Sequence, residues 1–167
     1  TNGIMLGNDE FCDKIAKLSY NRLHFGISLK GASEKEYIQF CNNDVWQLVL
    51  HALDNCNKNN FSYSLSYVLT PENAEGLTTF AQKIKDCGIN KNISFVICND
   101  IISSDGNIIR NSYHPLEIDK ILSEKYDDVS KILDNKLSLH QTLPLCQVDS
   151  KMLDYLISRN QITTSCH

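Results

Sequence analysis

The feature that most constrains this fold is the alternation of short apolar runs with amphipathic helical patterns. Runs typical of buried strands cover residues 22–29, 61–69 and 92–98. Helical spacing of apolar side chains marks the segments 9–19, 44–55, 74–86 and 115–135. Short apolar strands separated by helices indicate parallel pairing through crossover helices, with both faces of the sheet buried. We therefore predict an α/β fold of alternating parallel strands and helices, either half of an open sheet or part of a barrel.

Local signals refine these boundaries. Residues 33–36 read S-E-K-E, a capping box in which Ser33 begins a helix and Glu36 reaches back to it. Gly88 follows the helical segment 74–86 and suits a left-handed residue after a helix end. We expect 99–111 to be a polar loop with a turn at 104–106, because Ser, Asp and Gly cluster there.

Composition limits the kinds of partner. The 167 residues are 42% hydrophobic with a net charge of -4, which argues against disorder and gives no electrostatic reason to expect nucleic acid as a partner. No apolar run approaches the roughly 20 residues of a membrane span, and nothing at the start resembles a signal peptide. We expect a soluble, cytoplasmic protein without a membrane partner.

Seven cysteines are widely spaced, and no pair forms CxxC, which disfavours a disulfide framework or a zinc ribbon. Those that fall within helical patterns are expected to be small buried apolar side chains: Cys12, Cys41, Cys56 and Cys87. The later Cys146 and Cys166 lie outside the strong helical patterns.

Polar residues follow each expected strand. They are Thr1-Asn2-Gly3, then the segments 28–31, 70–73 and 98–100. In parallel α/β folds the ligand lies at the carboxyl ends of the strands, so these tips are candidates for a site. Ser28 and Thr70 offer hydroxyls that can donate and accept hydrogen bonds, although ordinary capping of strand ends would explain the same two residues.

The ordered tips resemble those of radical SAM enzymes. Thr1-Asn2-Gly3 looks like the end of that family's third strand, and Ser28-Leu29-Lys30-Gly31-Ala32 is similar to the SLDG-type end of the fourth, with Lys30 where Asp is frequent. Residues 67–70 with Asn73 resemble the fifth strand and its turn, and residues 95–98 resemble the sixth. The resemblance implies part of a (β/α)6-type partial TIM barrel, with contacts to S-adenosylmethionine (AdoMet) from Ser28, Thr70, Asn73, Val96 and Ile97.

One departure separates the chain from the family pattern. The CxxxCxxC loop, which holds the 4Fe-4S cluster that cleaves AdoMet, is absent from these residues. We therefore expect a C-terminal half of a partial barrel, truncated at both ends. The parent protein would be a radical SAM enzyme, while catalysis by this chain alone is uncertain. An exposed edge of the incomplete sheet would then favour dimerisation of the fragment.

The resemblance also divides the chain. Residues 1–113 would be later βα units of the barrel, and residues 114–167 a helix and the start of an extension of the SPASM or twitch type. Cys146 and Cys166 would then be ligands of an auxiliary iron–sulfur cluster, and the substrate would be a peptide or protein. The alternative for these two cysteines is a pair of ordinary thiols.

Two other functions stay open. A non-catalytic α/β binding or interaction module would use Ser28 and Thr70 only as caps. A TIM-like enzyme half would use Asp100 or Glu72 as an acid or base.

Overall fold

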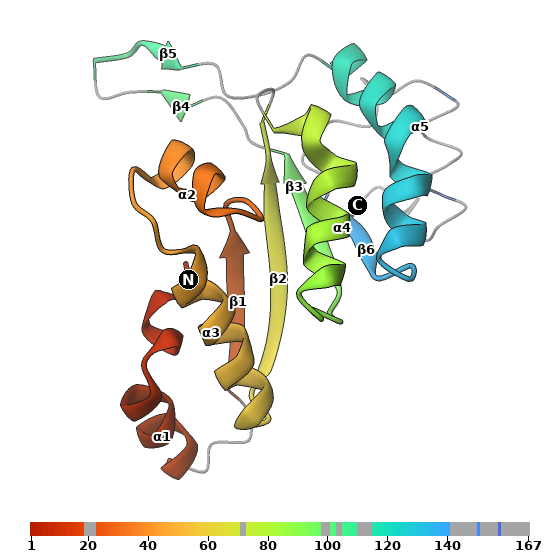
Figure 1. The fold of residues 1–167 in the computed structure, drawn as a ribbon. Helices are drawn as coiled ribbons and strands as arrows, with labels where there is room; N and C mark the ends of the chain where they lie inside the picture. Colours follow the sequence, from red (N-terminus) through yellow and green to blue (C-terminus); the bar gives the residue numbers. More distant parts are fainter. Residues whose placement is uncertain are drawn as a thin grey trace, which may run out of the picture.

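The computed structural model describes residues 1–18, 23–70, 73–97, 101–102, 105–109 and 115–140, with Ser150 and Ile157. Its centre is a four-stranded parallel sheet in the order β1-β2-β3-β6 (Figure 1). The strands are β1 (His24–Leu29), β2 (Ser62–Leu69), β3 (Ile93–Ile97) and β6 (Leu137–His140). Each consecutive pair is linked through at least one helix, which confirms the predicted class of alternating parallel strands and helices.

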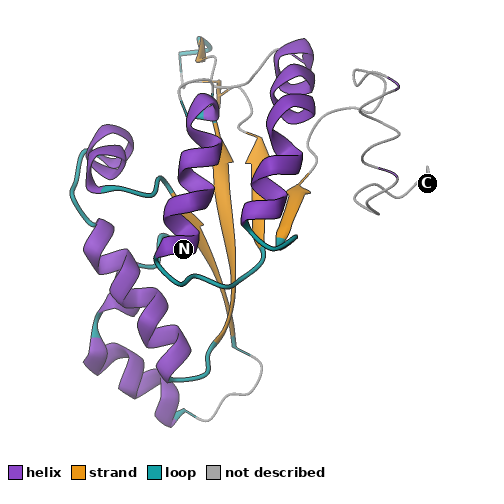
Figure 2. Ribbon diagram, turned by 45° about the vertical axis from the view of Figure 1, so that its right-hand side comes forward, coloured by secondary structure: helices purple, strands orange, loops and turns teal. Residues whose placement is uncertain are grey.

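The remaining elements are η1 (Ile4–Gly7), α1 (Asp9–Lys17), α2 (Glu34–Cys41), α3 (Trp46–Lys58), η2 (Ala74–Gly76), α4 (Leu77–Asp86), β4 (Ile101–Ile102), β5 (Ile108–Ile109) and α5 (Pro115–Ile132). Helices α3, α4 and α5 lie on the same face of the sheet (Figure 2). Among the described residues, no helix is both long enough and apolar enough to cross a membrane.

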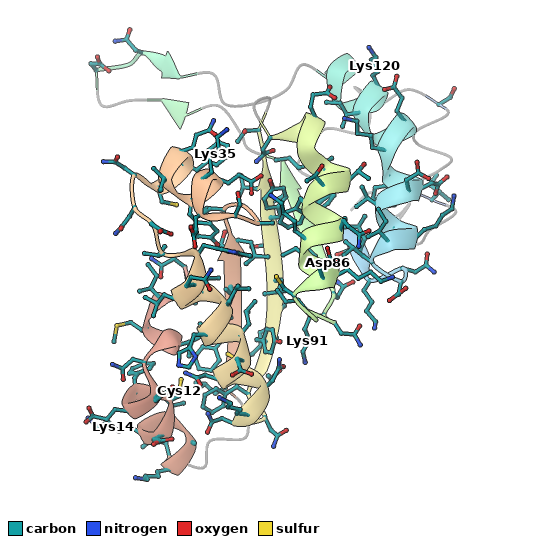
Figure 3. The ribbon with its side chains drawn as sticks, viewed as in Figure 1. Cys12, Lys14, Lys35, Asp86, Lys91 and Lys120 are labelled. Carbon is teal, nitrogen blue, oxygen red and sulfur yellow. The ribbon has the colours of Figure 1, made fainter. Side chains whose placement is uncertain are left out.

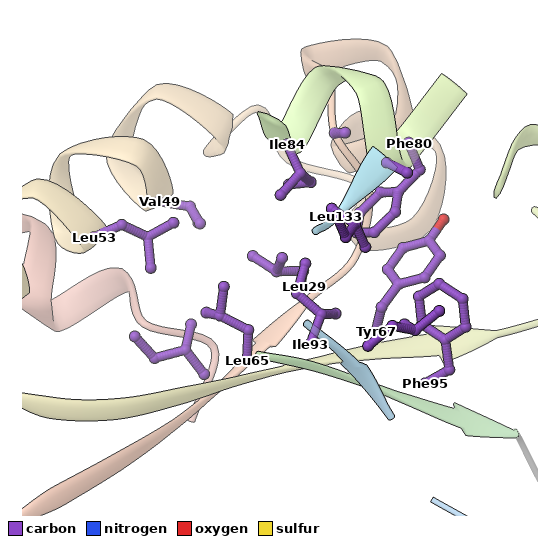
Figure 4. Packing of buried hydrophobic residues seen from close by; sticks show 14 of the residues in the cluster. Leu29, Val49, Leu53, Leu65, Tyr67, Phe80, Ile84, Ile93, Phe95 and Leu133 are labelled. Carbon is purple, nitrogen blue, oxygen red and sulfur yellow. The ribbon is translucent and has the colours of Figure 1, made fainter. Parts of the chain in front are cut away.

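The core lies between that helical layer and the facing side of the sheet (Figure 4). In β2 the burial alternates along the strand, with Tyr63, Leu65, Tyr67 and Leu69 buried and the residues between them exposed or half-buried. The expectation that the strands are buried on both faces is therefore wrong. The segment 62–69 reads S-Y-S-L-S-Y-V-L, a period of two that is typical of a strand with one buried face.

Three aromatic rings form the centre of the core. Tyr67 of β2 and Phe80 of α4 are stacked with ring centroids 3.8 Å apart, and Phe95 of β3 lies 5.9 Å from Tyr67 and 6.4 Å from Phe80. All three are at most 2% exposed. Because the rings come from two strands and one helix, their contacts hold α4 against the middle of the sheet.

Two strand pairings differ from the sequence predictions. β6 forms a fourth parallel strand beside β3, although its four residues, L-S-L-H, are too few to indicate a strand by themselves. The segment predicted as a polar loop contains an antiparallel pair, β4 and β5, with Gly106 at φ +81° in the turn between them.

The predicted helix signals are present. The Ser33 side chain accepts a hydrogen bond from the Glu36 N–H at 3.3 Å, and Glu36 Oε2 accepts from the Ala32 N–H at 2.6 Å. The return bond of the capping box thus reaches one residue before the cap. Gly88 has φ +69°, which confirms the predicted left-handed position after α4.

Polar contacts of side chains join α1, α3 and η1 at the far end of β1 from the strand tips. Asn55 of α3 is buried, and its Nδ2 donates to the Leu6 carbonyl at 3.0 Å and to Asp9 Oδ1 at 2.9 Å. His51 Nε2 lies 2.8 Å from the same Asp9 oxygen. The hydrogen bonds from Asn55 and His51 hold the pKa of Asp9 below its ordinary value.

This lowered pKa makes one part of the stability depend on pH. A carboxylate whose pKa is depressed by folding stabilises the protein above its unfolded value of about 3.9, and that contribution is lost as the pH falls through the folded value. We expect chemical denaturation of the Asp9→Asn variant and of the unmodified protein to differ most above pH 5 and to converge toward pH 2. Asp13→Asn, an exposed change on the same helix, is the control. A difference that stays constant over this range would contradict the assignment.

The four described cysteines are free thiols in two environments. Cys12 and Cys56 are buried as predicted, and burial raises the pKa of Cys56 to about 11. Figure 3 labels Cys12 near the lower end of the helical layer. The prediction is wrong for Cys41 and Cys87, which are exposed. Cys41 is the last residue of α2, and Cys87 directly follows the last residue of α4. The helical spacing of apolar residues extends to both positions, but the buried residues of each helix lie before them.

Candidate functional site

The carboxyl ends of β1, β2 and β3 lie side by side at one edge of the sheet (Figure 1). The register pairs Ser28 with Ser66 across β1 and β2, and Val68 with Val96 across β2 and β3. The strands that carry the predicted site residues are therefore neighbours in the structure. The described tip residues are Ser28, Thr70, Asn73, Val96 and Ile97.

Thr1 continues the sheet beyond the outer edge of β1. Its nitrogen donates to the Gly26 carbonyl at 2.9 Å, and the Ser28 N–H donates to the Thr1 carbonyl at 2.9 Å. These two bonds form one rung of a parallel ladder opposite Ile27. The geometry supports the interpretation of Thr1 as the end of a strand next to β1, while dimerisation through this edge stays a prediction.

The turn after Thr1 needs a glycine. Gly3 has φ +78°, and a Cβ added there would lie 3.0 Å from Ile27 Cγ2. A side chain at this position would be strained by both its backbone conformation and its contact with β1. Gly3 therefore lets the chain turn from the Thr1 rung into η1 directly over the end of β1.

The tip of β1 is held by α2. The Lys30 N–H donates to the Tyr37 hydroxyl at 3.2 Å, and Tyr37 is 2% exposed. Burial raises the pKa of Tyr37 to about 12, so its hydroxyl stays neutral at physiological pH. A Cβ added to Gly31 would meet Glu36 Cβ at 2.4 Å, so this residue lets the loop pass close to the first turn of α2. The position of Ser28 and Lys30 is thus set by a helix as well as by the sheet.

The tip of β2 is closed by Asn73. Its Oδ1 accepts from the Thr70 N–H at 2.9 Å, its Nδ2 donates to the Val68 carbonyl at 2.8 Å, and its own N–H donates to the Thr70 carbonyl at 3.1 Å. Both side-chain atoms of Asn73 therefore bond the backbone of β2. This residue shapes the turn that carries Thr70, and Thr70 and Asn73 are both half-buried.

The sheet face opposite the helices carries a mixed surface just below these tips. Ser28, Ser66, Val68 and Val96 are all half-buried on this face. Ser28 and Val96 were predicted from the sequence, whereas Ser66 and Val68 were not. The period-two pattern of 62–69 was the signal that could have found them, because it places both residues on the face of Ser28.

Several sequence candidates lie outside the described residues, among them Cys146, Cys166, Glu72 and Asp100. For Ile97 the backbone alone is described, as the last residue of β3 opposite Leu69. Within the described part of the chain, no group of three or more His, Cys, Asp or Glu side chains could hold a metal ion.

Comparison with solved structures settles the fold. Over 99% of this chain, native anSMEcpe with bound AdoMet and the Kp18Cys peptide superposes with a TM-score of 0.64 at 18% identity. The form with AdoMet and the Cp18Cys peptide gives 0.65 over 99%, also at 18% identity. The chain shares the fold of these anSMEcpe structures. This confirms the fold that the strand tips indicated.

The shared fold covers only part of the anSMEcpe chains. The chain spans 43% and 44% of the length of those two anSMEcpe chains, which is less than half. His-tagged anSMEcpe with bound AdoMet matches over 83% of this chain and 36% of its own, with a TM-score of 0.62 and 18% identity. No protein-family model and no curated protein matches the sequence.

Proposed function

We propose that this chain supplies an AdoMet-binding part of a radical SAM protein. The observation that carries the proposal is the juxtaposition of hydroxyl, amide and apolar groups at the carboxyl ends of β1, β2 and β3. The anSMEcpe structures with this fold contain bound AdoMet, which supports the same ligand here. A nucleoside needs both hydrogen-bonding groups for its ribose and apolar surface for its base, and this edge offers both.

The described residues divide the work of binding. Ser28 would hydrogen-bond the ribose, because its half-buried hydroxyl can both donate and accept. Val96 would contribute apolar surface to the adenine, and the backbone of Ile97 would offer its polar groups beside it. Thr70 and Asn73 would fix the position of the turn at the end of β2, because the Asn73 side chain bonds the Thr70 N–H and the Val68 carbonyl.

The sequence of this chain does not supply the ligands of the primary 4Fe-4S cluster. Its sequence has no CxxxCxxC, so primary ligands would have to lie outside these residues. Bound together with a reduced cluster, AdoMet supplies radical chemistry in the family that the tips resemble. No step of that chemistry follows from the described side chains. Their task is to bind and orient the cofactor.

A peptide or protein is the proposed substrate class. Two anSMEcpe structures with this fold hold a peptide beside AdoMet. The sheet face opposite the described helices would form one wall of the space that such a substrate enters. Cys146 and Cys166 are proposed as ligands of an auxiliary cluster, with spectroscopy of their serine variants as the test.

Binding of S-adenosylhomocysteine tests the proposal. We expect isothermal titration of the protein in its full natural length to give one site per chain, with affinity about fivefold to tenfold lower for Ser28→Ala because one hydrogen bond is lost. Asn43→Ala, an exposed change in the loop between α2 and α3, is the control and should bind normally. Absence of binding by the unmodified protein would overturn the proposal and favour a non-catalytic α/β module.

A further inference from the structure

A row of four serines crosses the sheet, two residues before Val68 and Val96 along β2 and β3. The register aligns Ser28, Ser66, Ser94 and Ser138, one from each strand, and all four are half-buried. Interior positions of packed barrels usually carry bulky branched residues. Hydroxyls at these positions leave room beside the sheet and make the wall able to form hydrogen bonds.

Two serines of the row form side-chain hydrogen bonds with described residues, and two do not. Ser94 Oγ and Ser138 Oγ lie 2.8 Å apart, and Asn92 Nδ2 donates to Ser138 at 3.2 Å. Ser28 and Ser66 have no side-chain hydrogen bond to any other described residue. A half-buried hydroxyl without a protein partner bonds water or a ligand.

The serines below this row are also occupied. His24 Nδ1 lies 2.8 Å from Ser62 Oγ, and His24 Nε2 lies 2.9 Å from Ser64 Oγ. The imidazole thereby joins β1 to β2 near the start of both strands. Among the described serines of this sheet face, the hydroxyls left for a ligand are therefore the adjacent pair Ser28 and Ser66.

The spacing of this pair matches a vicinal diol. Side chains in register on neighbouring strands start about 5 Å apart, and each hydroxyl reaches a partner oxygen at about 2.7 to 2.8 Å. Two neighbouring serines can thus each bond one of two adjacent hydroxyls. Val68 lies two residues beyond Ser66 on the same face and pairs with Val96, so apolar surface for a base adjoins the hydroxyl pair.

We propose that Ser66 is a second ribose-binding residue, which acts with Ser28 to clamp the 2′ and 3′ hydroxyls of the nucleoside. This inference rests on the proposed AdoMet site and adds a residue and a specificity to it. Each serine bonds a different ribose hydroxyl. The pair would therefore distinguish ribonucleosides from their deoxy forms.

Titration with S-adenosylhomocysteine and its 2′-deoxy and 3′-deoxy analogues tests this assignment in the protein of full natural length. We expect Ser66→Ala to weaken binding of S-adenosylhomocysteine about fivefold to tenfold. With the analogue that lacks the hydroxyl bonded by Ser66, the same substitution should have no further effect, since the two losses are not additive. Ser28→Ala should show the same non-additivity with the other analogue.

Ser94→Ala is the matched control, because it removes a hydroxyl of the same row that already bonds Ser138. It should leave binding of all three ligands unchanged. Normal binding by the unmodified protein together with unaltered affinity of Ser66→Ala would overturn this inference and leave the proposed function standing. Equal losses for Ser66→Ala with all three ligands would also overturn it. Absence of binding by the unmodified protein would overturn both.

Discussion

Replacing Phe80 by alanine is expected to lower the free energy of unfolding by about 3 to 5 kcal/mol, the usual cost of removing a buried aromatic ring. Phe80 is 1% exposed, stacks on Tyr67 and lies 6.4 Å from Phe95. Its removal would leave a cavity between α4 and the sheet that neither β2 nor β3 can fill by moving alone. Urea denaturation followed by circular dichroism measures the change.

Phe40→Ala provides the matched control for this cavity. The two substitutions remove the same atoms, but Phe40 lies on α2 and is 36% exposed. It should therefore cost much less, about 1 kcal/mol. Equal losses for the two variants would mean that the Phe80 ring stacked on Tyr67 does not lie at the centre of the core.

The second large effect is expected at the tip of β2. Asn73→Ala removes the groups that bond the Thr70 N–H and the Val68 carbonyl, and both partners are then left without that hydrogen bond. An unsatisfied, partly buried backbone group costs about 1 to 3 kcal/mol. We expect the free energy of unfolding to fall by about 2 kcal/mol. We also expect the affinity for S-adenosylhomocysteine to be at least about tenfold lower, which corresponds to a loss of about 1.4 kcal/mol of binding free energy.

Asn73→Asp separates the shaping of the tip from general destabilisation. Aspartate keeps an oxygen that can accept from the Thr70 N–H but cannot donate to the Val68 carbonyl. It should recover part of the affinity lost in Asn73→Ala. Asn43→Ala should match the unmodified protein in both stability and binding. Undiminished affinity of Asn73→Ala, measured at a temperature where the variant is folded, would show that this tip does not belong to the site.

The two effects have a common structural origin. The aromatic core fixes the positions of β2 and β3 against α4, and Asn73 then fixes the turn at the end of β2. A site made from the ends of parallel strands depends on both, because a change in height of one strand separates groups that come from different strands. Phe80→Ala should therefore act mainly on the free energy of unfolding, whereas Asn73→Ala should lower both the free energy of unfolding and the affinity for S-adenosylhomocysteine.

Much of the architecture was predictable from local patterns. Apolar spacing located α1, α3, α4 and α5, and the S-E-K-E segment located the start of α2. The alternation of strands and helices implied parallel pairing because a parallel connection needs a crossover. Polar residues after each strand indicated the edge where a site would form. These features depend on near neighbours in sequence, so the chain carries them locally.

Other features were decided only by tertiary structure. The short strand β6 is stable because β3 and α5 lie beside it, and the sequence of L-S-L-H by itself indicates no partner. Which face of the sheet is polar depends on where the helices pack, and they cover the opposite face. Likewise, the sequence contains Ser28, Ser66, Ser94 and Ser138 at unrelated positions.

The register brings these four serines into one row and determines which hydroxyls bond one another. The sequence by itself therefore determined the kinds of element, their order and the polar chemistry at the ends of the strands. Which strands are neighbours, which sheet face the described helices cover and which hydroxyls bond one another depend on the tertiary structure. The physical reason is that register and burial arise from contacts between segments far apart in the chain, whereas helix and strand patterns arise within each segment.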